Sequence, residues 1–103
     1  GMSKPRYPWW GYVKAIIRQY NGGKFTPASA SQIAEYQAVR EAVEQTKAMN
    51  GGKERIWLVR IVFWERTHTL EGAALEVHCS ERTARRWHTD FILLVAKKRG
   101  LLD

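Results

Sequence analysis

The segment IWLVRIVFW at residues 56–64 most restricts the folds open to this chain of 103 residues. Its β-branched and aromatic side chains are typical of a buried strand. A lone strand would leave its backbone N–H and C=O groups unpaired, and we find no second stretch of strand-like composition. The sequence therefore predicts a central helix over residues 53–67, covered by neighbours on almost all sides and interrupted only by Arg60.

Glycine and proline divide the rest of the chain into further helical segments. The clearest breaks are NGGKFTPAS at residues 21–29 and NGG at residues 50–52. The spacing of apolar side chains predicts helices over residues 9–20 and 30–49. The apolar side chains that we expect on one face of the second of these helices are Ile33, Tyr36, Val39 and Val43.

The segment TLEGAALEVHCSERTARRWH, which begins at Thr69, has the spacing of a helix-turn-helix. Thr69 and Ser80 are the predicted N-caps of its two helices. Ala73 and Ala74 are small enough to let the helices approach closely, and Cys79 can fill the angle between them as a small apolar side chain. The turn position often occupied by glycine is His78 here, and two interpretations are open: a left-handed backbone at some energetic cost, or a slightly longer turn.

Ala84, Trp87 and Phe91 follow one another at the spacing that buries one stripe of the second helix. The opposite face is strongly basic. At the start of such a helix, arginine side chains suit the major groove of DNA, where they bond phosphates or pair bidentately with guanine. A merely solvated basic face is the alternative. The residues that this pattern turns outward are Glu81, Arg82, Arg85, Arg86 and Thr89.

The formal net charge of +7 is concentrated at the two ends of the chain. Residues 1–20 carry four basic side chains and no acidic one, and residues 80–103 carry six basic and three acidic ones. Basic clusters of this kind indicate a polyanionic partner. Further phosphate contacts are predicted for Lys4, Arg6, Lys14, Arg18, Lys97, Lys98 and Arg99.

The same helix-turn-helix segment resembles region 4 of sigma factors. The segments YPWWGYVKAIIRQY, VFWERTHTLEGAA and SERTARRWHTDFILLVAKKRGLLD resemble small phage-encoded regulators of Gram-positive bacteria, the RinA-like and ArpU-like late transcriptional activators. The resemblance implies an all-α prophage regulator that binds double-stranded DNA. It implies the recognition-helix role for Ser80, Glu81, Arg82, Thr83, Arg85 and Arg86.

We expect one domain over residues 1–103, with an N-terminal helical part at 9–49 and the helix-turn-helix part at 53–99. Two other functions stay open. One is a small terminase subunit that recognises a DNA packaging site and forms a larger ring. The other is a module that binds RNA polymerase through its aromatic N-terminal face, which includes Trp9 and Trp10.

FILLVA at residues 91–96 is apolar on every side, and two explanations are open. The segment could be buried against residues 9–20, or it could form a homodimer that presents two recognition helices. We favour the dimer.

Several classes of function lack a signature in the sequence. His68, His78, Cys79 and His88 do not have the spacing of a zinc site, so no metal or cofactor is predicted. No motif of an enzyme is present. No apolar run is long enough to span a membrane. The single cysteine fits a reducing cytoplasm.

Overall fold

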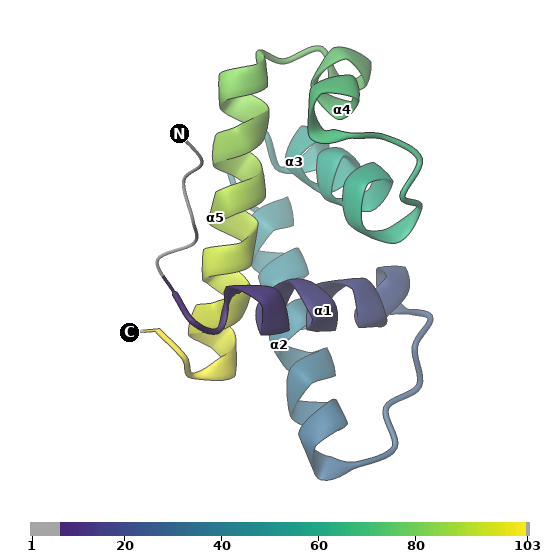
Figure 1. The fold of residues 1–103 in the computed structure, drawn as a ribbon, viewed down its shortest axis with the longest axis vertical. Helices are drawn as coiled ribbons and strands as arrows, with labels where there is room; N and C mark the ends of the chain where they lie inside the picture. The colour runs from purple at the N-terminus through teal and green to yellow at the C-terminus, as the bar shows by residue number, and fades with distance from the viewer. Residues whose placement is uncertain (1–6, 103) are drawn as a thin grey trace.

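The computed structural model describes residues 7–102, and within this range the fold is entirely helical. The predicted all-α fold of about five helices is confirmed. The 19-residue helix α5 forms the long axis of the molecule, α1 crosses its C-terminal half, and α4 lies beside its N-terminal end (Figure 1). The elements are α1 (Trp10–Tyr20), η1 (Asn21–Gly23), α2 (Ala30–Lys47), α3 (Gly52–Val59), η2 (Arg60–Trp64), α4 (Leu70–Val77) and α5 (Glu81–Arg99).

The segment at residues 56–64, which has strand-like composition, is helical throughout. This agrees with the prediction made from the lack of a second strand to pair with it. The segment begins as α3 and widens into the π-helical turn η2, in which the N–H of Glu65 bonds the carbonyl of Arg60 at 2.8 Å. The widened turn carries Trp64 to α1, where its indole N–H donates to the carbonyl of Ile17 at 2.8 Å. That carbonyl is one of the last four of α1, which have no partner within their own helix.

Two apolar clusters hold the helices together, and α5 belongs to both. The larger cluster joins α1, α2, Phe63 and the C-terminal half of α5. The smaller one joins Leu58 and Ile61 to α4 and to Ala84 near the start of α5. Trp57 and Trp64 are half-buried at the edges of these clusters.

Most of the apolar segment 91–96 is covered within one chain. Phe91, Ile92, Val95 and Ala96 are buried, and α5 packs on both α1 and α2. Burial against residues 9–20 therefore accounts for one side of the segment, and α2 covers another. The homodimer stays a prediction.

Ser29 caps the N-terminus of α2, and the apolar face of this helix differs from our expectation. Ser29 accepts a bond from the N–H of Gln32, whose side chain in turn accepts from the N–H of Ser29, at 3.1 and 3.4 Å. Ile33 was expected in the core and is 43% exposed. The reason is its position, because the first turns of α2 extend past α1 and have no helix above them (Figure 1). The buried side chains of α2 are Ala38, Val39, Ala42, Val43 and Thr46.

Candidate nucleic-acid interface

The helices α4 and α5 meet at the predicted sharp turn. His78 ends α4 in the left-handed conformation, with φ 64° and ψ 44°. The N–H of Cys79 then bonds the carbonyl of Ala74 at 3.0 Å, and the half-buried Cys79 side chain packs on the smaller cluster. Ala73 and Ala74 are buried, which lets α4 lie close against α5. The small contact residues and the apolar plug are thus where the sequence placed them.

Both helices of this unit begin with the predicted caps. The hydroxyl of Thr69 accepts a bond from the N–H of Gly72 at 3.1 Å. The hydroxyl of Ser80 accepts from the N–H of Thr83 at 3.0 Å and donates to the hydroxyl of Thr83, also at 3.0 Å. Ser80 and Thr83 therefore use their hydroxyls to fix the start of α5 before any ligand arrives.

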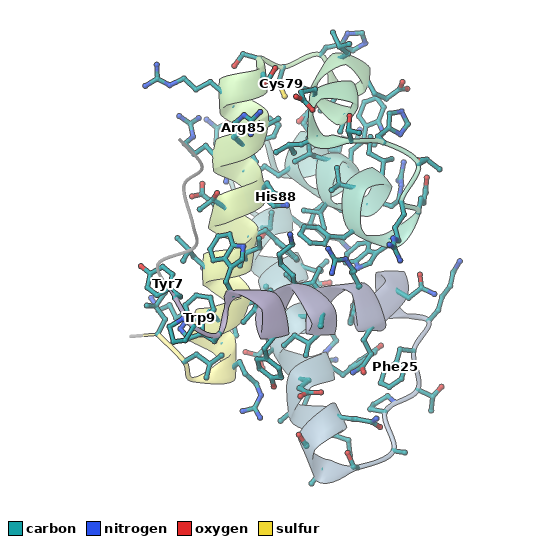
Figure 2. All side chains as sticks on the ribbon, in the orientation of Figure 1. Tyr7, Trp9, Phe25, Cys79, Arg85 and His88 are labelled. Carbon is teal, nitrogen blue, oxygen red and sulfur yellow. The ribbon has the colours of Figure 1, made fainter. Side chains whose placement is uncertain are left out.

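The four charged site residues that we predicted lie exposed on the first turns of α5. Thr83 and Thr89 are half-buried, so Thr89 faces outward only in part. Arg85 lies on the same stretch of α5 as His88, above the point where α1 crosses (Figure 2). The four exposed charged residues of α5 and one glutamate of α4 form the candidate interface, which we call the recognition surface. It consists of Glu71, Glu81, Arg82, Arg85 and Arg86.

Arg85 differs from the other two arginines of the recognition surface. Its Nη2 lies 2.6 Å from Glu81 Oε2 and 3.9 Å from Glu71 Oε2. The hydrogen bond and the charge of Glu81 raise the pKa of the Arg85 guanidinium. Within residues 7–102, no carboxylate lies within ion-pair distance of Arg82 or Arg86. The Glu71 contact crosses from α4 to α5, and the sequence had not revealed it.

A further arginine, Arg55 of α3, contacts two side chains of α5. Its guanidinium lies 5.5 Å from the centre of the Trp87 ring, and its Nη1 lies 3.5 Å from Asp90 Oδ2. A cation over an indole face is attracted by the negative charge density of the ring. Arg55 therefore orients Trp87 at the edge of the core. Sequence reasoning missed this residue, because only the fold brings α3 and α5 together.

His88 lies beneath the basic side of α5. Its ring stacks on Phe63, with centroids 5.0 Å apart. Burial, together with the positive charges of Lys14, Arg18 and Arg85, lowers the pKa of His88 to about 4. His88 is therefore neutral at neutral pH. The two cations of α1 and Arg85 of α5 thus all act on the same imidazole.

The other predicted contacts are spread over the chain. Tyr7 and Trp9 lie beside the C-terminal half of α5 (Figure 2), with ring centroids 4.6 Å apart. Trp9 and Trp10 pack against the larger cluster and so cover the core. Arg99 donates to the hydroxyl of Tyr12 at 3.2 Å. Lys97 and Lys98 are exposed, whereas Lys4 and Arg6 lie outside the described residues.

The described part of the chain contains no cluster of three or more His, Cys, Asp or Glu side chains that could hold a metal ion. Among its helices, none is long and apolar enough to cross a membrane. Comparison with known proteins adds no relative, since no family model, curated protein or solved structure matches the chain.

Proposed function

We propose that the chain is a sequence-specific binder of double-stranded DNA, without enzymatic activity, that regulates phage or prophage transcription in the cytoplasm. One observation carries the proposal. The turn at His78 and the cap at Ser80 fix the start of α5, so that three arginines leave the core on its first turns. A rigid helix with an exposed basic start is the element that helix-turn-helix proteins insert into the major groove.

The charges of α1 support the same orientation on DNA. Lys14 and Arg18 are one helical turn apart on α1, and both act on the same histidine of α5 as Arg85 does. With α5 in the major groove, these two side chains face the phosphate backbone beside it. Phosphate contacts of this kind supply affinity and salt dependence, and they carry no sequence information directly.

Fluorescence anisotropy with duplex DNA over a range of salt concentrations tests the proposal. The double variant Arg82→Ala/Arg86→Ala removes two exposed cations from the recognition surface. Arg40→Ala/Lys53→Ala removes the same charge from exposed positions of α2 and α3, outside the two helices α4 and α5. We expect the first variant to lose about tenfold or more in affinity and the second to lose much less.

The result against the proposal is equally specific. Equal losses in both variants, or no binding by the wild type at low salt, would mean that the basic face is only solvated. If the wild-type protein then retains RNA polymerase in a pull-down, the result would favour the RNA polymerase-binding module instead.

The regulatory role is proposed as activation, because the sequence resembles phage late activators. A reporter under a prophage late promoter is expected to rise with the wild type and to stay flat with Arg82→Ala/Arg86→Ala. Light scattering of the free protein distinguishes the assemblies. A dimer fits two recognition helices on one site, whereas a larger ring favours the small terminase subunit.

A further inference from the structure

The recognition surface contains two carboxylates, although it is proposed to meet a polyanion. Its three arginines and two glutamates leave a net charge of only +1. A surface built for phosphate affinity alone gains nothing from Glu71 and Glu81, because each carboxylate repels the DNA backbone. Each carboxylate is favourable in the first turn of its own helix, and both also face Arg85, which points to a further role in selecting among sequences.

Both carboxylates converge on a single arginine. Glu81 lies one turn before Arg85 on α5, and Glu71 approaches from the first turn of α4. Only Glu81 is within hydrogen-bond distance of Nη2, and Glu71 lies 3.9 Å from it, so one Nη2 hydrogen and those of Nη1 remain for another partner. Arg82 and Arg86 have no such contact among the described residues and are free to follow the nearest phosphates.

We propose that Glu71 and Glu81 hold Arg85 as the base-reading arginine of the recognition surface, while Arg82 and Arg86 bind the phosphate backbone. This inference rests on the proposed DNA binding. A guanidinium that is already oriented loses less side-chain freedom when it pairs bidentately with guanine O6 and N7.

The two carboxylates also act against wrong sequences. On DNA without a guanine in reach, Arg85 makes no bidentate pair that compensates for bringing Glu71 and Glu81 towards the phosphates. Discrimination then comes from a repulsive element as well as an attractive one, which is a general route to specificity. The carboxylates are therefore expected to weaken binding to DNA in general and to weaken it least on the preferred site.

The experiment starts with selection of duplexes that have a randomised centre by the wild-type protein. The affinities for the selected duplex and for a scrambled duplex of the same composition are then measured at one salt concentration. The test variant is Glu71→Gln/Glu81→Gln. Its control, Glu41→Gln/Glu54→Gln, makes the same charge change at exposed positions of α2 and α3.

We expect the test variant to bind the scrambled duplex roughly threefold or more tightly, and its preference for the selected duplex to fall by a similar factor. The control variant should strengthen both affinities alike and keep the preference. An unchanged preference in the test variant would overturn the inference while leaving the DNA-binding proposal in place. If the wild type enriches no duplex and binds none, both proposals fail together.

A pair of charge-conserving variants tests the assignment of Arg85 separately. Lysine keeps the positive charge but cannot form the planar fork that pairs with guanine. Arg85→Lys should therefore lose preference for the selected duplex with little change on the scrambled one. Arg86→Lys should preserve the preference. Equal effects of the two variants would contradict the assignment of base reading to Arg85.

Discussion

His88 stacks face to face on Phe63, with ring centroids 5.0 Å apart and ring planes inclined by 5°. The contact joins α5 to the π-helical turn and places an ionisable ring beneath the cations of α1 and α5. A neutral imidazole fits this position, whereas an imidazolium would be poorly solvated and would face three positive charges.

The stability of the fold should therefore depend on pH through His88. Its pKa is about 4 in the folded chain and about 6.5 when unfolded, so the unfolded state takes up the proton first as the pH falls. The contribution of His88 is complete above pH 6.5 and is lost progressively towards pH 4. We expect a loss of about 2 kcal/mol between pH 7.5 and pH 4.5, measured by urea unfolding.

His88→Gln is the control for this prediction. The variant loses the aromatic stack and is less stable at neutral pH, but it lacks the titrating group. Its stability should fall less over the same pH range, and the difference between the two curves isolates His88. Parallel curves for the wild type and the variant would count against the depressed pKa.

Gly52 permits the close approach between the end of α2 and the start of α3. A Cβ at this position would lie 2.3 Å from the carbonyl oxygen of Lys47. Gly52→Ala should therefore cost about 3 kcal/mol in the free energy of unfolding, because backbone rather than a flexible side chain must move. Gly11→Ala is the matched comparison, since nothing lies within 4 Å of that position.

Gly11 lies inside α1, where alanine is the better helix former, so the second variant should gain about 0.5 to 1 kcal/mol. Thermal unfolding of both proteins measures the contrast. Similar melting temperatures for the two variants would contradict the close approach at Gly52.

The turn between α4 and α5 offers a stabilising substitution. His78 has a φ of 64°, which glycine adopts without a steric penalty. His78→Gly should add about 0.5 kcal/mol to the free energy of unfolding. His78→Val should lower it, because a β-branched side chain fits the left-handed region poorly. The midpoints of urea unfolding measure both changes, provided that the dependence of the unfolding free energy on urea concentration is the same in all variants. The prediction fails if the valine variant is as stable as the glycine variant.

The indole of Trp64 acts as a C-terminal cap for α1. Trp64→Phe removes the donor to the Ile17 carbonyl and should cost about 1 kcal/mol beyond the loss of ring area. Trp57→Phe makes the same change in area at another half-buried tryptophan of the same helical segment. The difference between the two variants in urea unfolding reports the hydrogen bond. Equal destabilisation would assign the effect to packing alone.

Local signals in the sequence were sufficient for the helices and for the turn that positions α5. Thr69 and Ser80 each cap a helix by accepting a hydrogen bond from the N–H three residues later. The left-handed backbone at His78 follows from the small number of residues between α4 and α5. Each of these features depends on near neighbours in the chain. The contact of Arg85 with Glu71 could not be found in this way, because Glu71 lies on another helix.

The contacts that we missed all depend on how helices cross. Glu71 meets Arg85 only once α4 folds back on α5, and Phe63 meets His88 only because of the widened turn at the end of the central helix. Ile33 was misplaced for the same reason, since helical spacing does not reveal where a neighbouring helix stops. Periodicity thus predicts a face, and the lengths and crossing angles of the partners decide whether that face is covered.

Because α5 belongs to both apolar clusters, this helix connects the two halves of the core. Its first turns sit on the smaller cluster, and its last three turns are anchored in the larger one. Arg85 therefore shares one rigid helix with the buried side chains of Phe91 and Val95, about two to three turns away.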